Sequence, residues 1–352
     1  MRPTFHNIKV SEVRRETDDT VSVAFEIPDE LKVEYQFLAG QYLTLKTIID
    51  GEEIRRSYSL CSSPLDREWR VAIKKITEGK FSTFANESLK PGDQIEVMVP
   101  TGGFHVEPKA DHKKSYALFA AGSGITPIIS IIKTILQEEP NSDVILFYGN
   151  KGFANIIFRE EIEGLKNKYM NNLRVVHVLS RESLGNEIQK GRINSQKIED
   201  LYNAFLKDTE INEVFVCGPE EMILNVKDFF TEKTNANVHF ELFTTSESNK
   251  PKVVSNEPSI EANVKVIIDG DTLDVAMTSE GESILDAAYK VGGDLPFACK
   301  GGVCCTCKAK IIEGLARMDV NFALEPDEVE AGYILTCQAH PTSEKLTISF
   351  DD

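Results

Sequence analysis

The stretch Phe297-Ala-Cys299-Lys-Gly-Gly-Val-Cys304-Cys305-Thr-Cys307 carries cysteines in C-x4-C-x2-C spacing, and Cys337 follows after 29 intervening residues. Seven cysteines in 352 residues are too few for a disulfide scaffold, and five of them lie in this one region. In a reducing compartment such a cluster favours a metal site over bridges. Three thiolates on one loop and a fourth from another strand suit a compact iron–sulfur cluster. Gly301 and Gly302 let backbone N–H groups turn towards the sulfurs.

Four thiolates also bind structural zinc, but such sites usually show two short C-x2–4-C pairs. Cys305 is the extra cysteine, and we expect it to be a small apolar neighbour of the ligands. The spacing resembles that of plant-type 2Fe-2S ferredoxins. This resemblance implies a β-grasp-like α+β ferredoxin domain in residues 261–352 that carries one electron at low potential. The ligands it implies are Cys299, Cys304, Cys307 and Cys337.

The rest of the chain divides into segments that differ in the periodicity of their hydrophobic residues. Residues 1–107 contain short alternating strands separated by turns, which predicts an antiparallel β-barrel, with another β-sandwich left open. Residues 108–243 alternate buried-type strands with helices, as in a doubly wound α/β sheet. Residues 244–260 are polar with two prolines and predict a semi-flexible linker on which the last domain swings.

Two short motifs in the predicted barrel suggest a nucleotide-like ligand. The segment Arg56-Ser57-Tyr58-Ser59, placed just after a predicted strand, offers a guanidinium, hydroxyls and an aromatic ring to a phosphate and a flat ring system. Further on, Gly79-Lys80-Phe81-Ser82 is predicted to be a loop that holds a pyrophosphate through its amides and hydroxyl. The first motif alone also fits a cationic surface strand. Together the two motifs resemble the R-x-Y-S and G-x-x-S signatures of the ferredoxin–NADP reductase family.

That resemblance implies a six-stranded barrel that binds FAD. It places Arg56 at the pyrophosphate, Tyr58 against the isoalloxazine, and Ser59 near the reactive nitrogen of the flavin. Backbone contacts are expected from the strand around residues 71–74. The full set of residues expected at the FAD is Arg56, Ser57, Tyr58, Ser59, Ala72, Ile73, Lys74, Gly79, Lys80, Phe81 and Ser82.

A predicted strand at residues 116–121 runs into Gly122-Ser123-Gly124-Ile125-Thr126-Pro127 and then a helix. The glycines permit a tight turn, with Thr126 as N-cap and Pro127 as the first helical residue, so that free N–H groups face a pyrophosphate. Pro127 replaces the third glycine of the dinucleotide fingerprint, and G-x-G alone also fits an ordinary turn. The resemblance supports the nucleotide interpretation, since that family carries G-x-G-x-T-P here.

The same family places a C-G-P motif at the nicotinamide, and this chain has Cys217-Gly218-Pro219 after a predicted strand. A buried structural thiol is the alternative for Cys217. The closing strand of the family corresponds to residues 240–243, which would bring Glu241 and Phe243 to the flavin from the nicotinamide side. The resemblance therefore implies a catalytic set of Ser59, Cys217 and Glu241.

The choice of nicotinamide coenzyme depends on the residues after the next predicted strand. Ser180 and Arg181 provide a hydroxyl and a guanidinium that suit a 2′-phosphate, which favours NADPH. The neighbouring Glu182 suits a free ribose and leaves NADH open.

The domain order resembles the reductase components of phenylacetyl-CoA epoxidase and of related hydroxylase systems. NAD(P)H gives up two electrons as a hydride, a 2Fe-2S cluster accepts one, and a flavin can stand between them. We therefore expect an electron-transport enzyme, an NAD(P)H-dependent flavin iron–sulfur reductase that serves an oxygenase or another one-electron acceptor protein. A reductase for a fatty-acyl desaturase or a hybrid-cluster protein, and a non-enzymatic electron relay or redox sensor, are the alternatives.

The charge balance of the chain restricts the classes of binding partner that we expect. The formal charge is −17 and the sequence pI is about 4.9, which argues against general binding to nucleic acid or to an anionic membrane. Residues 262–352 are the more acidic part, with 16 acidic against 7 basic residues, and suit a partner with cationic patches. The sequence shows no basic-then-apolar leader and no apolar run of membrane-spanning length, so we expect a cytoplasmic protein.

Overall fold

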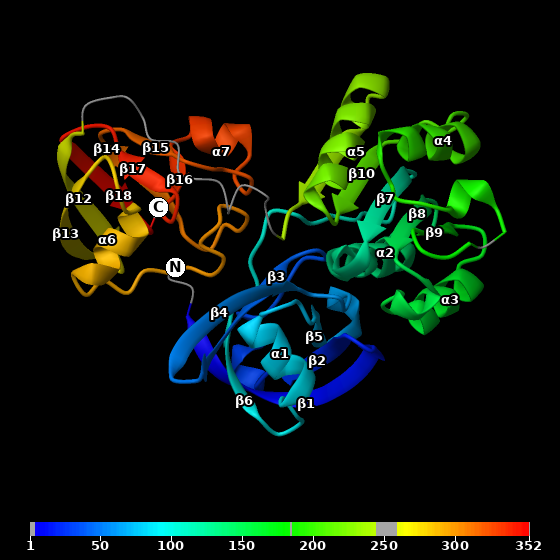
Figure 1. Cartoon of the computed structure of the whole chain (residues 1–352), viewed down its shortest axis with the longest axis horizontal. Coiled ribbons are helices and arrows are strands. Elements are labelled where there is room, and N and C mark those ends of the chain that lie inside the picture. Colours follow the sequence, from blue (N-terminus) through cyan, green and yellow to red (C-terminus); the bar gives the residue numbers. More distant parts are fainter. Residues whose placement is uncertain (1–3, 184, 244–258, 352) are drawn as a thin grey trace.

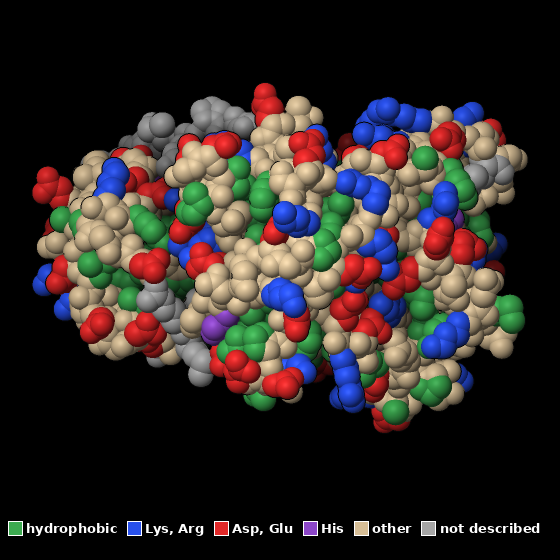
Figure 2. Space-filling view, turned by 90° about the horizontal axis from the view of Figure 1, so that it is seen from below, with side chains coloured by type: hydrophobic (Ala, Val, Ile, Leu, Met, Phe, Trp, Pro, Cys, Tyr) green, Lys and Arg blue, Asp and Glu red, His purple; other side chains and the backbone are tan. Residues whose placement is uncertain are grey.

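The computed structural model describes residues 4–183, 185–243 and 259–351, which form three β-sheet bodies (Figure 1). Most of the predicted linker, residues 244–258, lies outside these ranges. Within them, none of the helices combines the length and hydrophobicity required to cross a bilayer. On the face shown in Figure 2, acidic and basic side chains are interleaved.

The first body is a six-stranded antiparallel sheet in the order β4-β3-β6-β1-β2-β5. Just past the end of β4, Leu60 forms a bridge to Val71 of β5, so the two edge strands meet and the sheet closes into the expected barrel. Helix α1 (Lys80–Glu87) covers one end, and Phe81 is buried in the barrel core. The strands are β1 (Phe5–Thr17), β2 (Thr20–Glu26), β3 (Tyr42–Ile49), β4 (Glu52–Ser59), β5 (Trp69–Lys74) and β6 (Gln94–Met98).

The structure differs from the sequence prediction at both barrel motifs. Residues 56–59 lie within β4 rather than after a strand, because β3 and β4 form a hairpin and remain paired from Ile49 and Glu52 to Tyr42 and Ser59. The second motif is the start of a helix rather than a loop. Gly79 is the N-cap of α1, and the next three residues form its first turn.

The second body is a parallel sheet in the order β11-β10-β7-β8-β9, which confirms the doubly wound fold. From β7 the chain adds β8 and β9 on one side of the sheet and then β10 and β11 on the other, so the carboxyl ends of the adjacent parallel strands β7 and β10 form the topological switch point where such folds bind ligands. The strands are β7 (Ser115–Ala121), β8 (Asp143–Asn150), β9 (Leu173–Leu179), β10 (Glu213–Cys217) and β11 (Asn237–Glu241). The helices are α2 (Ile125–Glu138), α3 (Arg159–Lys168), α4 (Ser195–Phe205) and α5 (Glu220–Lys233).

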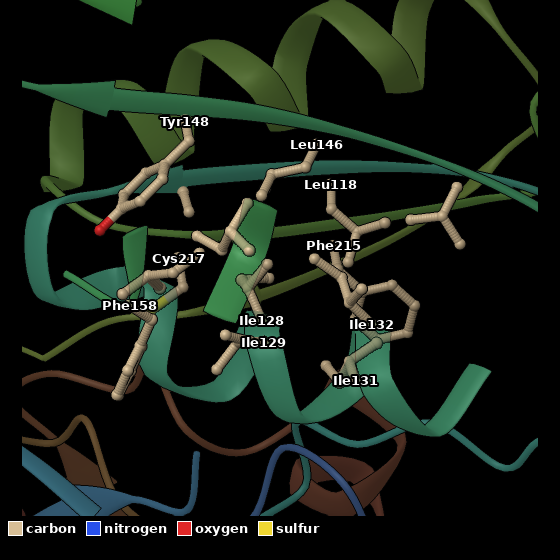
Figure 3. Packing of buried hydrophobic residues seen from close by; sticks show 14 of the residues in the cluster. Leu118, Ile128, Ile129, Ile131, Ile132, Leu146, Tyr148, Phe158, Phe215 and Cys217 are labelled. Carbon is tan, nitrogen blue, oxygen red and sulfur yellow. The ribbon is translucent and has the colours of Figure 1, made fainter. Parts of the chain in front are cut away.

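Helices cover both faces of this sheet. Figure 3 shows Ile128 and Ile132 of α2 beside Leu118 and Phe215 of the sheet. On the other face, α4 and α5 belong to a second buried cluster that includes Phe230. Apolar burial of this kind contributes roughly 25 cal/mol per Å² and fixes α2 against the strand that precedes it.

The start of α2 differs from the prediction. A short 3-10 turn over Gly122–Gly124 leads into α2, and Gly124 rather than Thr126 is the N-cap. The hydroxyl of Thr126 instead donates to the carbonyl of Ser123 at 3.0 Å. Helix α3 begins at Arg159, directly after Phe158, whose backbone is left-handed with φ of 59°.

The third body is a mixed sheet in the order β13-β12-β18-β14-β16, in which only β12 and β18 pair in parallel. The buried face of α6 (Ile284–Lys290) packs into its core, as the β-grasp-like prediction requires. The strands are β12 (Glu261–Ile268), β13 (Asp271–Thr278), β14 (Lys308–Glu313), β15 (Ala316–Met318), β16 (Tyr333–Leu335), β17 (Ala339–Pro341) and β18 (Lys345–Ser349), with α7 (Pro326–Glu330) before β16. The boundaries near residues 107, 243 and 260 stay predictions.

Candidate functional site

A cavity of about 680 Å³ lies where the three bodies meet. Its walls come from β4 and β5 of the barrel, the start of α1, the turn after β7, the end of β11 and the cysteine loop of the third body. The cavity therefore gathers segments that are far apart in the sequence. The expected residues that line it are Arg56, Ser57, Tyr58, Ser59, Ala72, Lys74, Gly79, Lys80, Phe81, Ser82, Ser123, Thr126, Glu241, Phe243, Cys299 and Cys304.

Other expected residues lie outside this lining. Ile73 points into the barrel core and is fully buried there. Ser180 and Arg181 are exposed just after β9. The remaining residues are Gly122, Gly124, Pro127, Cys217, Gly218 and Pro219 around the switch point, and Cys307 and Cys337 in the third body.

The barrel side of the cavity has the features that a flavin dinucleotide requires. The guanidinium of Arg56 is exposed and uses one nitrogen, Nη1, on the carbonyl of Arg55 at 2.7 Å. Gly79 provides no side-chain cap, so the first amides of α1 face outwards without a capping group. The ring of Tyr58 lies 5.6 Å from that of Phe81, centroid to centroid, and forms an aromatic wall. Cation, amides and aromatic wall together fit a phosphate and a flat ring.

Ser59, at the end of β4 in the barrel, contacts Glu241, at the end of β11 in the parallel sheet. The Ser59 hydroxyl donates to Oε2 of Glu241 at 3.2 Å. Burial raises the pKa of the Glu241 carboxyl to about 8, and the hydrogen bond from Ser59 opposes this only in part. Glu241 also pairs in register with Cys217 on β10. Burial holds the pKa of the Cys217 thiol well above its ordinary value, and the Glu241 charge adds to this, so the thiol is neutral.

The turn after β7 and the C-G-P turn after β10 are packed backbone to backbone. A Cβ atom on Gly124 would lie 2.1 Å from the carbonyl oxygen of Cys217 and 2.8 Å from the nitrogen of Gly218. A Cβ on Gly218 would in turn meet the side chain of Met222 at 2.7 Å. Only glycine permits this approach, and it brings the two turns of the switch point together.

The four expected ligand thiols form two pairs. The pKa of Cys299 is lowered to about 6, first by its hydrogen bond with the Cys304 thiol and then by nearby backbone amides. Cys307 and Cys337 are hydrogen-bonded in the same way. No three Cys, His, Asp or Glu side chains in the described ranges surround a single metal position. Two pairs of thiols suit a 2Fe-2S cluster, in which each of the two irons takes two cysteine ligands.

Amide groups also face these sulfurs. The N–H of Gly301 donates to Sγ of Cys299 at 3.3 Å, and Nε2 of Gln338 donates to Sγ of Cys337 at 3.7 Å. Such donors stabilise the negative charge of a ligated cluster. The side chain of Cys305 turns away and donates to the carbonyl of Ala323 at 3.2 Å, as expected for a residue that is not a ligand.

Several lining residues were missed by sequence reasoning. Tyr42 starts β3 but carries no recognisable motif, and Val303 is an apolar residue inside the cysteine loop. Leu242, between two expected residues, lies in the same lining. The segment Ile76-Thr77-Glu78 was the one with a usable signal, since it directly precedes the recognised motif at residues 79–82.

Comparison with known proteins agrees with this geometry. Family models match an oxidoreductase FAD-binding domain at residues 7–106, an oxidoreductase NAD-binding domain at residues 118–228 and a 2Fe-2S iron-sulfur cluster binding domain at residues 266–342. These domains define a flavin- and iron–sulfur-containing oxidoreductase that uses a nicotinamide coenzyme. The chain belongs to the family of such oxidoreductases that serve as reductase components of oxygenases.

The relatives align with nearly the whole chain. It is 41% identical over 350 residues to one of the subunits of 1,2-phenylacetyl-CoA epoxidase from Escherichia coli strain K12, covering 99% of this chain and 98% of the relative. It is 34% identical to the ferredoxin reductase component of 3-ketosteroid-9-alpha-monooxygenase of Rhodococcus rhodochrous, covering 97% and 96%. Among solved structures, phthalate dioxygenase reductase shares the fold with a TM-score of 0.61, 23% identity and 98% coverage of both chains.

Proposed function

We propose that this chain accepts hydride from NADPH and delivers single electrons to the oxygenase of a phenylacetyl-CoA epoxidase system. The observation that carries the proposal is a cavity lined both by the flavin motif and by Cys299 and Cys304. Bound FAD supplies the conversion of a two-electron donor into single electrons, and the 2Fe-2S cluster supplies a one-electron carrier. The acceptor is proposed from the 41% identity to an epoxidase subunit. The proposed location of the protein in the cytoplasm is argued from the sequence alone.

In this proposal the residues of the chain bind and orient the FAD and the nicotinamide, and they exclude water from the site. Arg56 and the first turn of α1 neutralise the pyrophosphate of the FAD, and Tyr58 covers one face of its ring. The neutral thiol of Cys217 and the two packed glycine turns hold the nicotinamide end close to the flavin. The Ser59 hydroxyl, which donates to Glu241, would lie beside a bound flavin, and the buried carboxyl of Glu241 would hold a proton next to it.

The local geometry after β9 supports NADPH over NADH. Arg181 is exposed, with its backbone fixed by an N–H bond to the carbonyl of Lys151 at 2.8 Å. The carboxylate of Glu182, which would favour a free ribose, is already occupied, since its Oε2 accepts from the N–H of Phe153 at 2.9 Å. The guanidinium is therefore the charge offered to a 2′-substituent, which suits a phosphate.

An anaerobic titration tests the first half of the proposal. NADPH is expected to bleach the flavin absorbance and then produce the electron paramagnetic resonance signal of a reduced 2Fe-2S cluster. Arg181→Ala is expected to raise KM for NADPH about tenfold, from the loss of one charge-assisted contact, and to leave KM for NADH unchanged. Arg192→Ala, a second basic residue on the same domain, is the control. A flavin that NADPH does not bleach would reject the proposal.

Reconstitution tests the acceptor. The reduced protein is mixed with the oxygenase subunits of a phenylacetyl-CoA epoxidase, and separately with the oxygenase of 3-ketosteroid 9-alpha-monooxygenase. Coupled NADPH oxidation is expected with the first and only background oxidation with the second. The reverse preference would refute the assignment of the acceptor while leaving the reductase function intact.

A further inference from the structure

One side chain of the barrel reaches both the flavin cavity and the cysteine loop. Tyr42, the first residue of β3, lines the cavity and is 5% exposed. Its hydroxyl accepts a hydrogen bond from the N–H of Cys305 at 3.2 Å. The same hydroxyl lies 3.2 Å from Oγ1 of Thr306, in a bond that either group can donate. Both partners lie between the ligands Cys304 and Cys307, so one phenol oxygen is bound to the inside of the cluster loop.

The barrel holds this tyrosine in place. The N–H of Tyr42 donates to the carbonyl of Thr101 at 2.9 Å, and the N–H of Thr101 donates back at 3.1 Å. Gly102 follows with φ of +128°, and a Cβ there would come within 3.1 Å of the Tyr42 ring. The ring packs in a small buried cluster with Ala298 and Cys304. A backbone bridge and a glycine next to the ring thus fix the direction in which the phenol points.

Further contacts steady the same loop through a cation–ring contact, an ion pair and apolar packing. The guanidinium of Arg55 lies 4.4 Å from the centroid of the Phe297 ring, and its Nη2 is 3.8 Å from Asp294. On the other side, Val303 and Phe322 pack against the hydrophobic cluster of the parallel sheet. Only Tyr42, among the side chains of the barrel in the described ranges, is hydrogen-bonded to the segment between two ligands.

We infer that Tyr42 is a positioning residue for electron transfer: its hydroxyl sets the register of the cluster loop on the flavin cavity. The kinetic part of this inference rests on the proposed function. Tyr42 neither gains nor loses the electron and takes no part in hydride transfer. The reduced flavin loses one electron at a time and the oxidised cluster gains it, and the phenol holds the two sites at a fixed separation.

The test uses the full-length protein loaded with both cofactors. Tyr42→Phe keeps the ring and deletes two hydrogen bonds, so the docking equilibrium of the loop is expected to fall about tenfold or more. Amide hydrogen exchange of the peptide that spans residues 297–308 should become faster by that factor. In anaerobic stopped flow, flavin bleaching by NADPH should keep its rate, while the later reduction of the cluster should slow. Iron content and the resonance spectrum of the chemically reduced cluster should be unchanged.

Tyr35→Phe is the matched control. Its hydroxyl is also buried in the barrel and donates to the carbonyl of Val97 at 2.6 Å, but it does not touch the third body. Thr306→Val removes a partner from the other side and should reproduce the Tyr42→Phe effect, with little further loss in the double variant. If Tyr42→Phe does not fold, Thr306→Val decides alone.

Unchanged exchange and unchanged cluster reduction in the folded variants would overturn the inference. Equal slowing by Tyr35→Phe would also overturn it, because the effect would then be a general loosening of the barrel. The exchange measurement needs no NADPH. A failure of the proposed reductase function, seen as absent flavin bleaching in the wild type, is therefore distinguishable from a failure of the docking role.

Discussion

Replacing Glu241 by glutamine should remove a pH-dependent loss of stability. The folded carboxyl has a pKa raised to about 8 by burial, against an ordinary value of 4.5. Between these two values the folded state binds a proton that the unfolded state has released, so stability falls as pH rises. The loss of stability caused by ionising the buried carboxyl is absent below pH 4.5 and reaches its full size above pH 8. Glutamine resembles the protonated side chain and does not titrate.

The size of the effect follows from the shift. Each pH unit between the two values costs the wild type about 1.4 kcal/mol relative to the variant. From pH 6 to pH 8 this amounts to at most about 3 kcal/mol, and we expect about 2 kcal/mol because Glu241 is partly exposed. For a domain of this size that corresponds to a Tm difference of roughly 4 to 8 °C.

The assay is thermal unfolding of both apoproteins across pH 5 to 9, with the transition of the nicotinamide-binding domain followed. The Tm of Glu241→Gln relative to that of the wild type should rise steadily from pH 5 to pH 8 and stay constant above pH 8. Glu232→Gln, at an exposed position of α5 in the same domain, is the control and should follow the wild type. Parallel pH profiles for wild type and Glu241→Gln would refute the argument, since burial would then not be shifting this carboxyl.

Two further predictions concern single atoms. Gly124→Ala should lower the free energy of unfolding by about 1 to 3 kcal/mol and weaken NADPH binding, because its Cβ would overlap the Cys217 carbonyl. Gly164→Ala is the control, since nothing lies within 4 Å of a Cβ at that position. NADPH binding, measured by fluorescence titration, should be unchanged in Gly164→Ala. Cys304→Ala should abolish the visible and resonance signals of the cluster, whereas Cys305→Ala should retain both, since the Cys305 thiol is bound to the Ala323 carbonyl instead. Loss of the cluster in Cys305→Ala would contradict the ligand assignment.

The sequence predicted best those features that a few neighbouring residues determine. The spacing of Cys299, Cys304 and Cys307 is local, because one loop must wrap the cluster, and the alternating strands and helices revealed the parallel sheet. Helix starts were less accurate, because the N-cap of α2 depends on the 3-10 turn at Gly122–Gly124 rather than on the good capping residue Thr126.

The site itself was only partly predictable. Arg56 and Tyr58 were recognised through a motif, although the structure puts that motif inside a strand. Tyr42, Leu242 and Val303 come from three different bodies and meet only when these pack together. No short pattern marks such residues, because their contribution is tertiary contact. The raised pKa of Glu241 likewise arises from burial, which the sequence does not display.

The cavity has one consequence for unfolding. Because its walls come from all three bodies, a flavin held there contacts every one of them, and its binding energy is gained only by the assembled molecule. The flavin therefore couples the melting of the three bodies. Calorimetry should find separable transitions in the stripped protein and a single, higher one after loading. At a flavin concentration a hundred times Kd, the added stability is about 2.7 kcal/mol.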